Sequence, residues 1–145
     1  MITYHPIRIG IVGVGNCASS LLQGIEFYRE RSDQNRNVVP LGLMHLEIGG
    51  YKPWDIEVRA AFDIDQRKVG KPLKEAIFAR PNCTQVIYPQ FNDSAVLVSM
   101  GEVLDGVSEH MRDYPDDRAF LVADEKPCDV ARRMVEEFIA GVRER

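Results

Sequence analysis

Apolar residues gather early in the chain in two short β-branched runs, each of which ends at glycine or aspartate. The first run, Ile7–Val12, reads IRIGIV and leads directly into Gly13 and Gly15. Apolar positions at Leu22 and Ile25 then follow with helical spacing. This order predicts a buried parallel strand, a glycine turn and a helix.

The second run predicts another strand at Glu57–Phe62, which stops at Asp63. A helix follows it, best supported over Leu73–Ala79, and Pro72 fits only the first turn of such a helix. Beyond these, the pattern predicts strands at Gln85–Tyr88, Ala95–Ser99 and Phe120–Val122 and a helix at Glu102–Met111.

The last predicted element is a helix over residues 127–142. Val130, Met134 and Phe138 recur every four residues there, and Val135 and Ile139 widen the apolar stripe. Strands that alternate with helices predict an α/β fold with a parallel sheet. The stretch 32–55 is read as an insertion between the first helix and the second strand, because loops of that length are uncommon in compact domains.

The composition is that of an ordinary globular chain. Its 145 residues fit one domain, 1–145, and 18 basic against 22 acidic side chains leave a net charge of −4, which gives no reason to expect a nucleic-acid partner. No apolar run reaches the about 20 residues of a membrane helix, so no membrane partner is expected. Three cysteines without CxxC spacing argue against a disulfide framework and favour a cytoplasmic location.

The glycine turn carries the candidate chemistry. Gly13, Gly15 and Ala18 form the dinucleotide fingerprint GxGxxA. The first glycine allows a tight turn, the second lets backbone approach a pyrophosphate, and the alanine lets the helix lie close to the sheet. The helix N-terminus adds free N–H groups and partial positive charge. The pattern predicts dinucleotide binding, and a purely structural turn is the alternative.

Asp63 ends the second predicted strand, where a carboxylate can bind the adenosine ribose hydroxyls. It lies 45 residues beyond Ala18, whereas the fingerprint places the acidic residue about 20 residues on, and the insertion absorbs the excess. A carboxylate there would repel the 2′-phosphate of NADP, so NAD is the expected cofactor. Arg67 and Lys68 weaken that preference slightly and are interpreted as the solvated start of a helix.

Other side chains offer less. Cys17 lies at a helix N-terminus, where a thiol can become reactive, and a small side chain packed beside the loop is the alternative. His5, His45 and His110 show no metal-ligand spacing. His45, in the glycine-rich insertion, is the best placed of the three for catalysis. No catalytic residue and no metal ligand are assigned.

The residues around the glycine turn resemble a known family. Residues 8–21, RIGIVGVGNCASSL, are close to the opening of the actinobacterial-type myo-inositol-1-phosphate synthases, also called inositol-3-phosphate synthases. Further similar segments are QGIE at 23–26, GLMH at 42–45, AAFDID at 60–65, KVG at 68–70, LDGV at 104–107 and, more loosely, KPCDV at 126–130. The resemblance extends over roughly residues 7–130.

The resemblance implies a Rossmann-type NAD-binding fold and a redox-neutral isomerisation of glucose 6-phosphate to 1D-myo-inositol 3-phosphate, a step of inositol and phospholipid biosynthesis. In that family bound NAD oxidises the sugar at C5, an aldol closure forms the ring, and the NADH reduces the product ketone. The implied cofactor-binding residues are Gly13, Val14, Gly15, Asn16 and Cys17 around the pyrophosphate, and Asp63 with Asp65 at the ribose.

Members of that family are longer than this chain. After the last helix they continue into another strand and a sheet-rich domain, which supplies the catalytic lysines and builds the tetramer. We therefore expect a sheet that is truncated after the last helix and keeps an unpaired edge. On this basis no catalytic residue is transferred, and glucose 6-phosphate is expected as a ligand only if the missing half is supplied.

Three functional interpretations stay open. The chain could be an N-terminal portion or short relative of such a synthase. It could instead be a stand-alone, non-catalytic nucleotide-binding or regulatory module. It could also be a structural or interaction remnant that associates with itself as a homo-oligomer.

Overall fold

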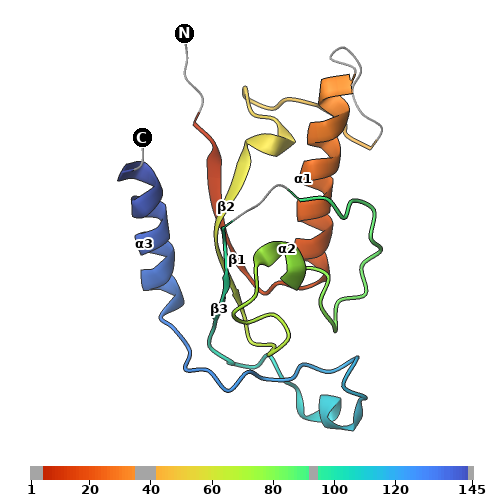
Figure 1. The fold of residues 1–145 in the computed structure, drawn as a ribbon, viewed down its shortest axis with the longest axis vertical. Coiled ribbons are helices and arrows are strands. Elements are labelled where there is room, and N and C mark those ends of the chain that lie inside the picture. The colour runs from red at the N-terminus through yellow and green to blue at the C-terminus, as the bar shows by residue number, and fades with distance from the viewer. Residues whose placement is uncertain (1–4, 35–41, 92–94, 144–145) are drawn as a thin grey trace.

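The computed structural model describes residues 5–34, 42–91 and 95–143. Helices lie on both sides of a small sheet (Figure 1). The elements are strands β1 (Ile7–Val12), β2 (Ile56–Asp63) and β3 (Val98–Met100), α-helices α1 (Asn16–Gln34), α2 (Leu73–Ala76) and α3 (Val130–Arg143), and 3₁₀ turns at Pro53–Asp55 and Glu109–Asp113.

The sheet is parallel throughout, in the order β1-β2-β3. β2 is central: Val12 of β1 pairs with Phe62, and Met100 of β3 pairs with Asp63. The carboxyl ends of the three strands therefore lie together at one end of the sheet, where the glycine turn begins. Within the described residues, no strand pairs with the other edge of β1. The predicted α/β class with a parallel sheet is confirmed.

The main core lies between the sheet and helices α1 and α2. It forms because α1 places apolar side chains at i, i+4 and i+7 toward the sheet, here Ala18, Leu22 and Ile25. The buried cluster consists of Ile11, Val14, Ala18, Leu22, Ile25, Ala61, Leu73, Ala76, Ile77 and Val98. This packing fixes the start of α1 against the end of β1.

Helix α3 covers the opposite side of the sheet from α1 (Figure 1). The flexible Met134 side chain of α3 packs against Gly10 of β1, where a built Cβ would lie 2.8 Å from Met134 Cε. Arg8 Nη1 adds a hydrogen bond of 3.2 Å to the carbonyl oxygen of Phe138. Val135 and Ile139, expected to widen the buried stripe, are instead 56% and 49% exposed.

Several predicted elements differ in the structure. Gln85–Tyr88 is not a strand, and Glu102–Met111 is not an α-helix, since turns lead there to the 3₁₀ turn at 109–113. Phe120–Val122 contributes only an isolated bridge between Val122 and Asp65. The predicted strand at 95–99 is replaced by the shorter β3, which begins at Val98 and ends one residue later at Met100, and the predicted helix at 73–79 shortens to the four residues of α2.

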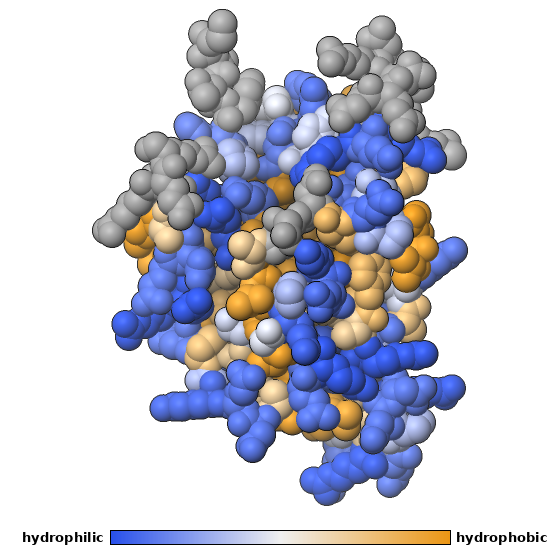
Figure 2. Space-filling view, viewed as in Figure 1, coloured by the Kyte–Doolittle hydropathy of each residue, from blue (hydrophilic) through white to orange (hydrophobic). Residues whose placement is uncertain are grey.

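The predicted insertion, 32–55, begins inside α1, and its part at 35–41 lies outside the described residues. Beyond it, Ile48 and Tyr51 form a bridge, and a 3₁₀ turn leads into β2. Hydrophilic and hydrophobic residues are mixed on the face shown in Figure 2, with hydrophobic residues exposed in its middle as well as at its sides. None of the helices in the described ranges is long and apolar enough to cross a membrane.

Candidate dinucleotide-binding site

The loop between β1 and α1 has the geometry that the glycine fingerprint requires. Gly13 has φ of 90°, a backbone conformation that residues other than glycine rarely adopt. Its amide donates a hydrogen bond to the Phe62 carbonyl oxygen at 2.8 Å. A Cβ built on Gly15 would meet no atom within 4 Å, so the space beside it is open. Ala18, at 7% exposure, packs into the core. Gly13 and Ala18 therefore play the structural parts expected of them, and the backbone at Gly15 borders open space.

The start of α1 favours an anion. The helix has 19 residues and no acidic residue in its first turn, so no side-chain carboxylate of that turn offsets the positive end of its dipole. Its first N–H groups have no partner inside the helix. Together with the open space beside Gly15, this gives a place where phosphate oxygens can accept hydrogen bonds from backbone.

Asp63 binds the glycine loop and the chain that follows β2. Its Oδ2 accepts a hydrogen bond from the Val14 amide at 2.7 Å. Its Oδ1 accepts from the amides of Ile64 at 2.8 Å and Asp65 at 2.9 Å. The residue is only 8% exposed. Since an ionised carboxylate has about four acceptor positions, three of them are used inside the protein.

Lys68 lies beneath the same loop, and its side chain is fully buried. Its Nζ donates to the Val14 carbonyl oxygen and to Asn82 Oδ1, both at 2.8 Å, and lies 3.7 Å from Asp63 Oδ2. Burial lowers the pKa of Lys68 below its ordinary value, and the charge of Asp63 opposes that shift. The interpretation of Lys68 as part of a solvated helix start is therefore wrong.

Asp65 lies in a second polar cluster. Its side chain is fully buried, and its carboxylate accepts hydrogen bonds from Arg67 Nε at 2.8 Å and from the Leu121 amide at 3.1 Å. Burial raises the pKa of Asp65, but the hydrogen bonds from Arg67 and from the Leu121 backbone outweigh it, so the pKa lies below its ordinary value. Arg67 also donates to the Ala119 carbonyl at 2.8 Å. The pair thus ties the end of β2 to residues 119–121.

Asn16 and Cys17 begin α1, and both are exposed. Asn16 Oδ1 accepts hydrogen bonds from the Cys83 amide at 2.8 Å and from Thr84 Oγ1 at 2.9 Å. The side chain of Asn16 therefore holds the 83–84 segment beside the loop. Because Cys17 is exposed, the interpretation of it as a packed small side chain is wrong.

Gln23, about two turns after the start of α1, is buried at 3% exposure. Its Oε1 accepts from the amides of Ile87 at 2.7 Å and Tyr88 at 3.1 Å, and its Nε2 donates to the Gln85 carbonyl at 3.2 Å. These bonds give the Gln85 carbonyl and the Ile87 and Tyr88 amides side-chain partners in a segment that was predicted to be a strand. Sequence reasoning missed Gln23, Lys68 and Asn82, because no local pattern marks a polar side chain for burial.

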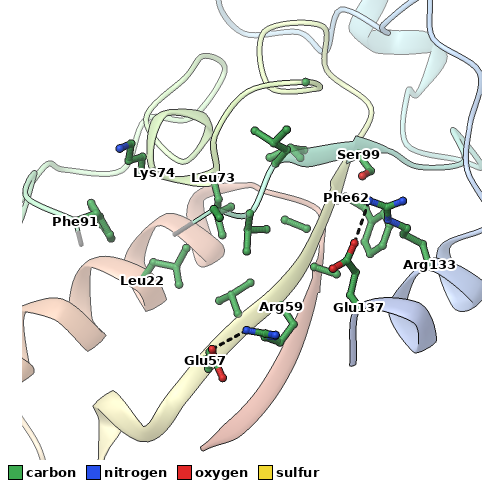
Figure 3. Close-up of a pocket in the computed structure, with 18 of the residues that line it drawn as sticks. Leu22, Glu57, Arg59, Phe62, Leu73, Lys74, Phe91, Ser99, Arg133 and Glu137 are labelled. Carbon is green, nitrogen blue, oxygen red and sulfur yellow. Dashed lines mark hydrogen bonds and ion pairs between the residues drawn. The ribbon is translucent and has the colours of Figure 1, made fainter. Parts of the chain in front are cut away.

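A cavity of about 870 Å³ lies elsewhere, along β2 and β3 between α1 and α3. Its charged side chains include two pairs at hydrogen-bond distance: Arg59 and Glu57 at 2.9 Å, and Arg133 and Glu137 at 3.0 Å (Figure 3). Residues 13–17 do not line it. The candidate site is therefore defined by backbone geometry at the strand ends rather than by this cavity.

The remaining candidates do not join the site. His5, His45 and His110 are exposed. Across the described ranges, no three His, Cys, Asp or Glu side chains are grouped so that they could hold a metal ion. The structure thus brings together residues 13–17 and Asp63, with Lys68 beneath them.

A parallel sheet whose first strand ends in a glycine loop, followed by a helix that starts at that loop, defines a Rossmann-like α/β fold. Inositol-3-phosphate synthase of Mycolicibacterium smegmatis is 44% identical over 130 residues, which are 90% of this chain and 33% of that protein. Among solved structures, Ari2 matches with a TM-score of 0.65 and 32% identity over 92% of this chain and 34% of its own. No protein-family model matches.

A myo-inositol-1-phosphate synthase-related protein from Thermotoga maritima shares the fold, with a TM-score of 0.55 and 22% identity over 94% of this chain and 32% of its own. The chain is homologous to the N-terminal part of inositol-3-phosphate synthase. It spans about a third of the length of the relatives it matches.

Proposed function

We propose that this chain binds NAD at the loop between β1 and α1 and serves as the cofactor-binding portion, or a short relative, of an inositol-3-phosphate synthase. The observation that carries the proposal is the open space beside Gly15 at the N-terminus of α1. A pyrophosphate is the part of NAD that needs such a space, because it must approach backbone N–H groups closely.

The residues present fit the cofactor. The backbone of residues 13–17, which are Gly13, Val14, Gly15, Asn16 and Cys17, would bind the pyrophosphate. Asp63 would accept a hydrogen bond from the adenosine ribose with the acceptor capacity that its three backbone donors leave. Asp65 has its oxygens engaged with Arg67 and Leu121, so its part is to hold the end of β2 in place.

The preference for NAD over NADP follows from hydrogen-bond chemistry. An ionised carboxylate only accepts hydrogen bonds. A ribose 2′-hydroxyl can donate to Asp63, whereas a 2′-phosphate dianion at the same place would add negative charge beside an acceptor. Lys68 and Arg67 already pair with Asp63 and Asp65, so they are not free to compensate that charge.

When bound, NAD would supply the capacity to accept and return a hydride, and the residues of this chain would hold and orient it. The proposal assigns no catalytic residue here. We propose conversion of glucose 6-phosphate to inositol phosphate only when the further residues that a complete synthase contains are also present.

The test is a calorimetric titration of the purified chain with NAD, and with NADP as the control. The proposal predicts saturable binding of NAD and at least about tenfold weaker binding of NADP, which corresponds to about 1.4 kcal/mol. Equal affinities would contradict the role given to Asp63. The absence of NAD binding would contradict the proposed function.

A further inference from the structure

A buried positive charge lies directly under the glycine loop. Lys68 is fully buried, and among the described residues the carboxylate paired with its Nζ is that of Asp63, at 3.7 Å. Burying an ammonium group costs several kcal/mol unless it is paired and hydrogen-bonded. Its two hydrogen bonds go to Asn82 Oδ1 and to the Val14 carbonyl oxygen, so the charge is held where the loop turns into α1.

Asn82 supports the same carbonyl. Its Nδ2 donates to the Val14 oxygen at 3.0 Å and to the Ile77 oxygen at 2.9 Å. The Val14 carbonyl thus receives two hydrogen bonds from side chains inside the protein, one of them from a charged donor. Hydrogen bonds with an ionised partner are roughly twice as strong as neutral ones.

The direction of this carbonyl decides the direction of the next amide. In a planar trans peptide the C=O and the N–H point in opposite directions. Because the Val14 carbonyl points inward to Lys68 and Asn82, the amide of Gly15 points away from them. A Cβ built on Gly15 would meet no atom within 4 Å, so this peptide borders open space.

We propose that Lys68 is a positioning residue for the pyrophosphate of a bound dinucleotide: it fixes the Val14–Gly15 peptide so that the Gly15 amide faces the anion, and it places a positive charge beneath it. The inference rests on the proposed function and deepens it. It predicts that Lys68 favours ligands through their phosphates and contributes little to recognition of the nucleoside.

The experiment compares Lys68→Met with the wild-type chain, using NAD, ADP and adenosine as ligands in NMR titrations. Lys71→Met is the matched control. Lys71 lies three residues after Lys68 and its side chain is exposed, so the variant removes the same charge from the surface. We expect Lys68→Met to weaken NAD and ADP by at least about tenfold and adenosine by less than about twofold, the tenfold change matching the loss of a charged hydrogen bond. Lys71→Met should change all three affinities by less than about twofold.

The outcomes separate the two claims. If the wild-type chain binds neither NAD nor ADP, the proposed function fails and this inference fails with it. If the wild type binds both but Lys68→Met keeps their affinities, only the role of Lys68 is wrong. Equal losses of affinity for ADP and for adenosine in Lys68→Met would show that Lys68 is only a structural residue, and this result would also overturn the proposal.

A second variant guards against misfolding. Lys68→Gln is neutral but keeps an N–H donor for the buried acceptors, and far-UV circular dichroism shows which variants retain the fold. Lys68→Gln should show a smaller but still selective loss of ADP affinity. A ratio of ADP to adenosine affinity equal to that of the wild type would overturn the proposal.

Discussion

The amide nitrogen of Val14 lies 2.7 Å from Asp63 Oδ2, so the carboxylate that ends β2 holds the loop that follows β1. The carbonyl of the same residue is held from below by Lys68 at 2.8 Å. Both backbone groups of Val14 are therefore fixed by a pair of opposite charges. The conformation of the glycine loop depends on this pair as well as on the glycines themselves.

The first prediction concerns Asp63→Asn. It leaves the buried Lys68 without its carboxylate and removes an acceptor from the backbone donors around it. Breaking one side of a buried ion pair costs about 3–5 kcal/mol, so we expect the free energy of unfolding to fall by about 3 kcal/mol. Urea denaturation followed by circular dichroism measures it.

Asp105→Asn is the control for that measurement, because Asp105 is exposed, and it should change the free energy of unfolding by no more than about 0.5 kcal/mol. A loss below about 1 kcal/mol for Asp63→Asn would show that the Val14 anchor contributes little to stability.

A second prediction follows from Asp65. Its pKa in the folded chain lies below the ordinary value of 3.8, because the hydrogen bonds from Arg67 and Leu121 outweigh burial. Because the pKa of Asp65 is lower in the folded than in the unfolded chain, the unfolded chain takes up the proton at a higher pH. The stability that Asp65 contributes is therefore complete above about pH 4 and is lost as the pH falls through the folded-state pKa. Urea midpoints recorded between pH 7 and pH 3 should fall less steeply with acid in Asp65→Asn than in the wild type. Identical acid profiles would rule out this contribution.

A third prediction concerns the segment after α2. Gln23→Ala removes the acceptor of the Ile87 and Tyr88 amides. Because these bonds are only partly buried, we expect the free energy of unfolding to fall by about 0.5–1.5 kcal/mol, the net contribution of an ordinary hydrogen bond. In hydrogen exchange, the amides of residues 87 and 88 should exchange faster. Asn16→Ala is the matched variant, and it should speed exchange at Cys83 and Thr84 instead. Unchanged exchange at 87 and 88 in Gln23→Ala would contradict the role of Gln23.

The sequence pattern predicted the part of the fold that local signals determine. β1, β2 and the start of α1 follow from β-branched runs and glycines, and the structure confirms them. The segments at 85–88 and 102–111 have apolar residues whose side chains face solvent: Ile87 is 63% exposed and Leu104 is 84% exposed. An apolar pattern predicts an element only when a partner covers it, and here distant side chains such as Gln23 decide the conformation.

The candidate site divides in the same way. The glycines and Asp63 were visible because their residue types are tied to backbone geometry and strand ends. Lys68 was not, since a lysine beside an arginine in a polar stretch looks solvated. Its burial results from Val14 and Asn82, which lie 54 and 14 residues away in the chain.

The measurement that tests the central claim most directly is NAD titration of Gly15→Val beside Gly24→Val. Both glycines have open space where a Cβ would lie, and Gly24 is further along α1, so each variant should keep the fold. We predict that Gly15→Val abolishes NAD binding, because its side chain fills the space of the pyrophosphate, and that Gly24→Val binds NAD like the wild type. Unchanged NAD affinity in a folded Gly15→Val would contradict the proposed site.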